Sequence, residues 1–229
     1  MKDLFSFLIL LASFSLFAQK EVSKEVKYEN QSVNVEFPFA SRVEIKTWDQ
    51  SAIKVDASIK TDEEKYTEMF DLEVKSDDSS IRIESNSKEI FRVYQDEKEG
   101  LKLFHDGLEH EFDYVMYVPK NVKLKLNSIT ANVTSEFVQG DIEIEVVSGD
   151  IAIEKHKGDL KLKSVAGKIE AVCENARLMA KTVVGEIHSD KNLKLERKDM
   201  LVGQEASMET ENAANSLSLT TVNGDIYLR

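Results

Sequence analysis

The residues with the clearest chemical spacing are aspartates that recur at a regular interval, each directly after a glycine. They are Asp141, Asp150 and Asp159. Calcium-binding nonapeptide turns share this spacing, but they need the doubled-glycine pattern G-G-x-G-x-D. Each unit here has one glycine, so the loop whose carbonyl oxygens wrap the ion is missing. We therefore expect no metal and no cofactor at these turns, and we interpret the aspartates as turn and ladder residues.

Catalytic patterns are weak in this chain. Polysaccharide lyases and hydrolases need clustered carboxylates, a basic residue and aromatic platforms in one groove. Residues 122–229 contain only Phe137 and Tyr227 as aromatic side chains. The histidines, which show no metal-ligand spacing on one strand, are His105, His110, His156 and His188. We expect no catalytic residue, and a carbohydrate-active β-helix enzyme, a lyase or glycosidase, remains the alternative.

Two single side chains and one short column have structural interpretations. Cys173 continues an alternation with Ile169 and Ala171, which predicts an inward-facing, unreactive thiol. Trp48 ends an expected strand at residues 43–47, where packing is favoured and a role as a contact residue is the alternative. A sparse column of small hydroxyl residues is expected to form turn hydrogen bonds. Its members are Ser128, Ser164, Thr182 and Thr221.

The elements that position these residues follow from the glycines after residue 139. These are Gly140, Gly149, Gly158, Gly167, Gly185, Gly203 and Gly224, and their numbers differ by 9, 9, 9, 18, 18 and 21 in turn. The residues after them repeat as well, for example GDIEI at 140 and GDIAI at 149. This spacing indicates that one short strand and one turn have been copied and stacked, with the glycines at the turns.

The apolar positions predict a parallel β-solenoid, an all-β fold. Apolar residues stand two and four positions after most of these glycines, and another stands two positions before alternate glycines, so the stronger period is twice the glycine spacing. One coil therefore has about 18 residues and two strands, and its cross-section is flat. The expected inward core comprises Ile142, Ile144, Val147, Ile151, Ile153, Leu160, Leu162, Val165, Ile169, Val183 and Ile187.

Coils that stack in sequence order would also align the residues that follow the turns in two ladders, one on each side, and the second would contain Asp141, Asp159 and Arg177. The first ladder would contain Asn132, Asp150, Lys168, Glu186 and Gln204. The longer step before Gly224 predicts a bulge or a looped-out turn.

The chain divides into three parts. Residues 1–18 have the pattern of a signal peptide, residues 19–121 a less regular β-rich first part of the solenoid, and residues 122–229 the regular repeats. Residues 62–70 have the one helix-like spacing, and residues 95–111 are expected to form an exposed excursion.

Composition limits compartment and partners. The apolar run at residues 4–16 is too short to span a bilayer, and no later segment is long enough, so we expect an exported protein in the periplasm or at the cell surface, with no membrane span in the mature chain. The chain has 42 acidic and 30 basic residues, a net charge of −12. Without a basic patch, this charge excludes nucleic acid as a partner.

Three segments together resemble a known family. They are V-E-I-K-T-W-D-Q-S-A-I-K-V at residues 43–55, Y-V-M-Y-V-P-K-N-V at 114–122, and the repeated V-x-G-D-I at 147–151 and 222–226. They are similar to the putative adhesin family (DUF4097) of bacterial β-solenoid envelope proteins. The resemblance implies an exported, non-enzymatic solenoid without catalytic residues. The residues Phe17-Ala18-Gln19 are similar to the signal ends of Bacteroidetes proteins.

The leading hypothesis is therefore a binding or structural module of the cell envelope, an adhesin by resemblance, whose ligand is an unidentified protein or glycan. A further alternative is a self-assembling envelope protein. The chain ends on a strand-like segment, residues 225–229, and an uncovered solenoid end can template pairing with another chain.

Overall fold

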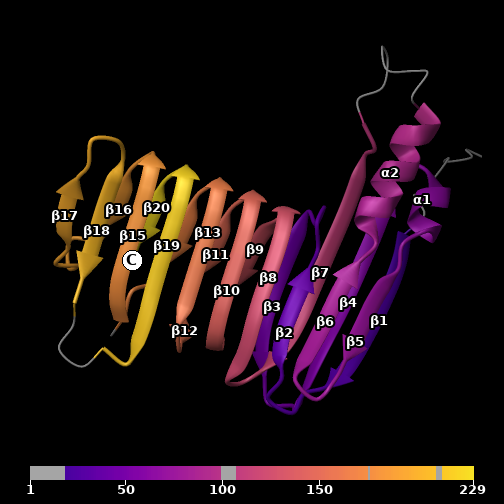
Figure 1. The fold of residues 1–229 in the computed structure, drawn as a ribbon, viewed down its shortest axis with the longest axis horizontal. Coiled ribbons are helices and arrows are strands. Elements are labelled where there is room, and N and C mark those ends of the chain that lie inside the picture. The colour runs from indigo at the N-terminus through magenta and orange to yellow at the C-terminus, as the bar shows by residue number, and fades with distance from the viewer. Residues whose placement is uncertain (1–18, 99–106, 175, 210–212) are drawn as a thin grey trace, which may run out of the picture.

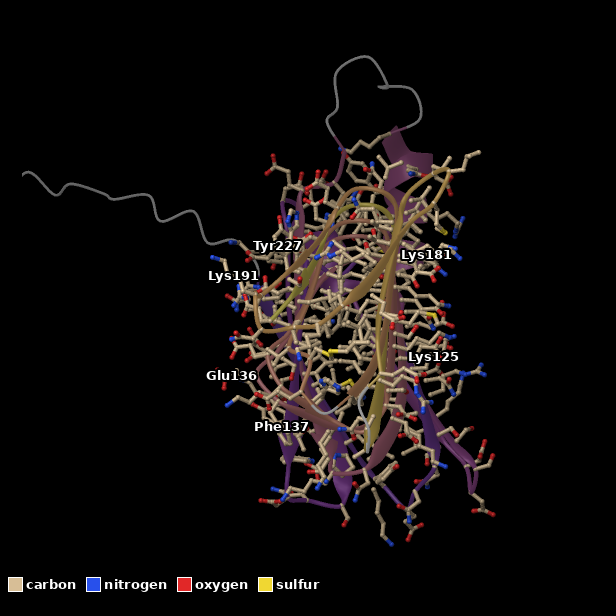
Figure 2. The ribbon with its side chains drawn as sticks, turned by 90° about the vertical axis from the view of Figure 1, so that its left-hand side faces the viewer. Lys125, Glu136, Phe137, Lys181, Lys191 and Tyr227 are labelled. Atoms are coloured by element: carbon tan, nitrogen blue, oxygen red, sulfur yellow. The ribbon has the colours of Figure 1, made fainter. Side chains whose placement is uncertain are left out.

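The computed structural model describes residues 19–98, 107–174, 176–209 and 213–229, and these residues form mostly β-structure (Figure 1). Two large, mixed but largely parallel sheets face each other with the core between them (Figure 2). The signal peptide expected at residues 1–18 lies outside the described residues, as do His105 and much of the expected excursion.

The first sheet, called sheet A, has the strand order β1-β4-β7-β3-β9-β11-β14-β20-β16. Its strands are β1 (Gln19–Lys27), β3 (Arg42–Trp48), β4 (Ala52–Thr61), β7 (His110–Pro119), β9 (Asn132–Ser135), β11 (Ile151–Ile153), β14 (Ile169–Ala171), β16 (Ile187–Ser189) and β20 (Ile226–Leu228).

The second sheet, called sheet B, has the order β17-β18-β15-β19-β13-β10-β8-β2-β6-β5, with β12 paired to β10 at the side. Its strands are β2 (Ser32–Glu36), β5 (Leu72–Ser76), β6 (Ser80–Ser85), β8 (Val122–Thr130), β10 (Val138–Ser148), β12 (His156–Lys157), β13 (Leu160–Ala166), β15 (Ala176–Val184), β17 (Glu196–Asp199), β18 (Gln204–Met208) and β19 (Asn215–Asn223).

From residue 122 to residue 189 the chain alternates between the sheets, so that each coil is one strand of sheet B followed by one of sheet A. Ile142 pairs in parallel register with Leu160, and Ile151 with Ile169. In each pair the second residue comes 18 residues after the first, which is the length expected for one coil. The predicted coil of two strands therefore agrees with the observed pairing.

The last coil does not stack in sequence order. The strand β19 lies between β13 and β15, and β20 lies between β14 and β16 (Figure 1). Residues 215–228 are thus inserted between the coil of residues 160–171 and the coil of residues 176–189. Before this insertion the chain makes an antiparallel hairpin, β17–β18, whose strand β18 pairs with β15 at one end of sheet B.

Four expectations are corrected by this order. The first ladder runs Asn132, Asp150, Lys168, Asp225, Glu186, because the inserted coil separates Lys168 from Glu186. The longer step before Gly224 is not a bulge; the looped-out alternative is closer, because the chain first runs back as β18, antiparallel to β15, before it returns as β19. Gly203 lies in the turn of the β17–β18 hairpin and not in a stacked coil, and Met200 donates a backbone hydrogen bond to its carbonyl. The terminal strand β20 is flanked on both sides, so it is not an uncovered solenoid end.

The core also corrects the inward set at three positions. Ile142, Ile144, Ile151, Ile153, Leu160, Leu162, Ile169 and Ile187 are buried. Val147 and Val165 are 50% and 47% exposed, and Val183 is half-buried. The residues one position earlier, Val146, Ser164 and Thr182, point inward instead, because neighbouring side chains of a strand face opposite sides. Ser164, Thr182 and Thr221 are buried there.

The glycine turns bring successive coils into close contact. Gly149 has φ +134°, and a Cβ placed on it would lie 2.0 Å from the carbonyl oxygen of Ala131 in the preceding coil. A Cβ placed on Gly224 would lie 2.1 Å from the carbonyl oxygen of Gly167, so the inserted coil has the same close turn. Any side chain at these positions would separate the coils.

The other end of the molecule carries two helices, α1 (Glu64–Glu68) and α2 (Ser87–Lys98), beside the first strands of both sheets (Figure 1). The helix α1 lies within the segment with helix-like spacing. The helix α2 was not expected. Its buried residues Ile90 and Tyr94 are four apart, on one face, and Tyr94 meets Tyr66 of α1 edge to face.

Candidate binding surface

The outer face of sheet B carries an uninterrupted row of aliphatic side chains at the carboxyl ends of its strands. We call this row the valine ladder. Its members, in spatial order, are Ile129, Val147, Val165, Val222 and Val183. The first four are 37%, 50%, 47% and 43% exposed. Soluble proteins rarely align exposed aliphatic side chains, so this row is the candidate contact surface of the molecule.

A groove of about 390 Å³ runs along the valine ladder. Its other walls include Pro38, from the segment after β2, and Lys88, from α2. The polar side chains Asn127, Glu145 and Lys163 line it toward the middle of the sheet. The groove therefore combines residues of the irregular first part with residues of the repeats.

The ladder is positioned by the hydroxyl column beneath it. Thr182 Oγ1 donates a hydrogen bond to the carbonyl oxygen of Gly224 at 2.9 Å. Ser164 Oγ bonds in the same way to Gly149 at 3.1 Å, and Thr221 Oγ1 to Gly167 at 3.2 Å. Each bond links the end of a sheet B strand to a glycine turn. The hydroxyl group turns inward to make this bond, so the residue that follows it on the strand, Val183, Val165 or Val222, faces outward. Before Val147 the inward position is taken by Val146, which is buried without a hydroxyl group.

Ion pairs between neighbouring strands border the ladder. Lys161 Nζ lies 2.6 Å from Glu143 Oε1, and Lys163 Nζ lies 2.6 Å from Glu145 Oε1. Lys125 lies 3.6 Å from Glu143 on the other side and projects outward from sheet B (Figure 2). The hydrogen bond from Lys161, with Lys125 nearby, lowers the pKa of Glu143 to about 2. Glu143 is therefore ionised at neutral pH and cannot serve as a general acid.

Trp48 lies on the outer face of sheet A, half-buried. Its ring centroid is 5.2 Å from that of Tyr117, and its indole nitrogen donates a 2.8 Å hydrogen bond to the carbonyl oxygen of Ala52. The Lys54 ammonium group lies 5.5 Å from the centre of the Tyr117 ring. Trp48 thus packs against its neighbours, as favoured from the sequence, and it does not line the groove.

The remaining sequence candidates are scattered. His110, His156 and His188 lie on β7, β12 and β16, and in the described part of the chain no group of His, Cys, Asp and Glu side chains could hold a metal ion. Burial lowers the pKa of His156. Cys173 is buried, and burial raises the pKa of its thiol, which agrees with an unreactive core residue. No helix among the described residues is both long and apolar enough to span a bilayer.

The valine ladder was not predicted as a surface, although Val147, Val165 and Val183 were predicted as core residues of the repeats. The signal was present in the alternation of Ser164 and Val165, which places one of the two outside. Val165 was assigned to the core, whereas the hydrogen bond from Ser164 Oγ to the carbonyl oxygen of Gly149 turns Ser164 inward and leaves Val165 outside.

No family model and no curated protein matches this chain. Among solved structures it is similar to a "putative cell adhesion protein" from Clostridium sporogenes, with a TM-score of 0.61, 12% sequence identity, and coverage of 92% of this chain and 99% of the other. The shared property is the fold. A "putative adhesin" from Parabacteroides merdae matches more weakly, with a TM-score of 0.31, 10% identity, and coverage of 74% and 67%; that likeness adds nothing to the fold assignment.

Proposed function

We propose that this chain is a non-enzymatic β-solenoid of the bacterial cell envelope that binds a protein partner along the valine ladder. The observation that carries the proposal is the alignment of four exposed aliphatic side chains beside a groove of about 390 Å³. Burying such a row against a partner is favourable by about 25 cal/mol per Å² of apolar surface removed from water.

A protein partner fits this surface better than a glycan does. Protein interfaces have an apolar centre and a polar rim, and here the valine ladder is bordered by Glu145, Lys163 and Lys88. Glycan sites commonly stack sugar rings on aromatic platforms. The aromatic side chains Phe137 and Tyr227 instead lie on the opposite side of the molecule from Lys125 and Lys181 of sheet B (Figure 2).

The absence of catalysis is part of the proposal. A glycosidase needs one carboxylic acid with a raised pKa beside a second carboxylate. In the charged groove on the outer face of sheet B, Glu143 has its pKa lowered to about 2 by Lys161, and Asp159 accepts hydrogen bonds from Ser216. Both carboxylates are engaged in holding neighbouring strands together.

The envelope location rests on three supports. The first is the signal-like pattern of residues 1–18, and the second is the resemblance of three segments to the adhesin-like family. The third is the name of the Clostridium sporogenes protein with the same fold. Together they favour an exported protein of the periplasm or cell surface.

A binding screen tests the proposal. The mature chain from Gln19 onward is immobilised and probed with purified envelope proteins and with a glycan panel. We expect a protein ligand whose affinity falls by about tenfold or more in Val147→Asp/Val165→Asp, because two charges would be desolvated on binding. The control variant is Met179→Asp, which is exposed on sheet B outside the groove and should bind normally.

Unchanged binding by the double variant would exclude the valine ladder as the contact surface. Turnover of any envelope or algal polysaccharide would replace the proposal with the enzyme alternative.

A further inference from the structure

The last coil of the chain fills a slot between two coils that precede it in sequence. We define the slot as the space between the coil of residues 160–171 and the coil of residues 176–189. Ile169 donates a backbone hydrogen bond to Asp225 at 3.0 Å, and Ile226 donates one to Glu186 at 2.9 Å. Both walls of the slot are therefore strand edges that residues 215–228 satisfy.

The slot is complementary to this segment in detail. Asp159 Oδ1 accepts hydrogen bonds from Ser216 N and Oγ at 2.8 and 2.7 Å, and Asn215 Oδ1 accepts one from Gly158 N at 2.8 Å. At the other end, Arg229 forms an ion pair with Glu170. The side chains that the segment buries are Leu217, Leu219, Thr221, Ile226 and Leu228.

The slot can be filled by residues 215–228 of the same molecule or by the same residues of a second copy. Every copy carries the same slot and the same segment. An exchange between copies replaces each contact by an identical one, which is why swapping an identical element is a low-cost route to a dimer.

We propose that two copies of this chain associate by exchanging their C-terminal coils, residues 215–229, so that each coil fills the slot of the other molecule. The exchange goes beyond the binding function proposed above and does not depend on it. It makes the valine ladder a composite surface, since Val222 of each ladder would come from the second copy.

Concentration during folding decides between the closed monomer and the exchanged dimer. A tethered segment sees its own slot at an effective concentration on the order of millimolar. Protein that folds at micromolar concentration should therefore close on itself, and exchange should grow as the concentration of chains approaches that range. An unfilled slot exposes two strand edges, which favours capture of whichever segment is nearest.

Paired cysteines in the full mature chain test the exchange. Lys163 and Thr220 are register partners on β13 and β19, so Lys163→Cys/Thr220→Cys reports which molecule supplies β19. The matched control is Glu145→Cys/Lys163→Cys, whose partners lie on β10 and β13 and belong to one molecule in either state. Both variants carry Cys173→Ala.

Each variant is refolded at about 1 µM, far below the crossover expected for a tethered segment, and at about 0.5 mM, close to it. The samples are then diluted, oxidised and analysed by non-reducing electrophoresis. We expect the Lys163/Thr220 pair to give about tenfold more covalent dimer at the higher concentration, while the control pair stays monomeric at both. Wild-type protein refolded in the same way, with its mass measured by light scattering after dilution, should show the same persistent dimer.

Monomeric cross-links at both concentrations, together with monomeric wild-type protein, would overturn the exchange. Equal dimer formation by the control pair would also overturn it, because cross-linking would then report random collision. Loss of ligand binding in the Val147→Asp/Val165→Asp variant leaves both readouts unaffected, so the two proposals fail separately.

Discussion

At the residue scale, the outer face of sheet B is ordered by charges that alternate between strands. Glu143 lies between Lys161 and Lys125 of its two neighbouring strands. The hydrogen bond from Lys161 is the main cause of its lowered pKa. The folded state therefore favours the ionised carboxylate more than the unfolded chain does, and the stability of the sheet depends on pH.

Replacing Glu143 should lower the free energy of unfolding and should make that free energy less dependent on pH in acid. The pKa is about 2 in the folded protein against an ordinary value of 4.5, so the stabilisation is present above about pH 4.5 and is lost as pH falls from there toward 2. We expect Glu143→Gln to lower the free energy of unfolding by about 1 kcal/mol at pH 7, allowing for solvent screening, and to flatten the decline below pH 4.5. Urea unfolding across pH measures both. A steeper decline in the variant would be inconsistent with this ion pair, and the exposed Glu154→Gln serves as control.

Steric contact, more than backbone strain, should dominate the cost of replacing a turn glycine. In Gly149→Ala the added Cβ would lie 2.0 Å from the Ala131 carbonyl oxygen, so we expect a loss of about 3 kcal/mol or more. Gly107 also has a positive φ, +97°, but no atom lies within 4 Å of its Cβ position. Gly107→Ala should therefore cost only about 1 kcal/mol. Thermal unfolding of both variants checks this difference, and equal losses would mean that φ alone determines the cost.

The corrected inward face gives a sharp comparison between two aspartate substitutions. Ile151 is fully buried, so Ile151→Asp should cost more than about 4 kcal/mol and abolish folding, because an unpaired charge would enter the stack. Val147 is 50% exposed, so Val147→Asp should change stability by less than about 1 kcal/mol. Circular dichroism and thermal melts measure both. A stable Ile151→Asp or an unfolded Val147→Asp would reverse the assignment of faces.

At the element scale, periodicity predicted the strands from residue 122 to residue 189 and the pairing of equivalent positions in successive coils. It could not predict which coil lies next to which. Leu160, Leu178 and Leu217 occupy equivalent positions in their coils. Leu217 lies in the middle and pairs with Leu160 on one side and with Leu178 on the other. Every coil presents the same columns, so sequential and inserted stacking satisfy the local pattern equally well. Strand order is thus a property of long-range pairing, which the repeat leaves open.

The helix α2 was missed for a different reason. Its apolar positions Ile90, Phe91 and Tyr94 recur at helical spacing, but residues 95–111 were expected to form an exposed excursion, and α2 extends into that segment as far as Lys98. Phe91 packs against Phe39, with ring centroids 4.2 Å apart. Residue 39 belongs to the connection between β2 and β3, so the helix is stabilised by a tertiary contact that local spacing does not show.

At the scale of the whole molecule, the two sheets form one stack whose ends are closed differently. Helices and antiparallel strands cover the end with the first strands, while the β17–β18 hairpin covers sheet B at the other (Figure 1). The inserted coil joins the repeats on both of its sides. This coil completes the valine ladder through Val222, so coil order underlies the proposed binding surface and the proposed exchange alike.

Coil order is tested most directly by two cysteine pairs oxidised in the native protein at micromolar concentration, again with Cys173→Ala. The inserted order places Thr220 beside Lys163 and also beside Lys181, so Lys163 and Lys181 lie about 9.6 Å apart, twice the strand spacing. A disulfide needs Cα atoms within about 7 Å. We predict that Lys163→Cys/Thr220→Cys forms a disulfide and that Lys163→Cys/Lys181→Cys retains two free thiols. A disulfide in the second pair and none in the first would show sequential stacking and contradict the account.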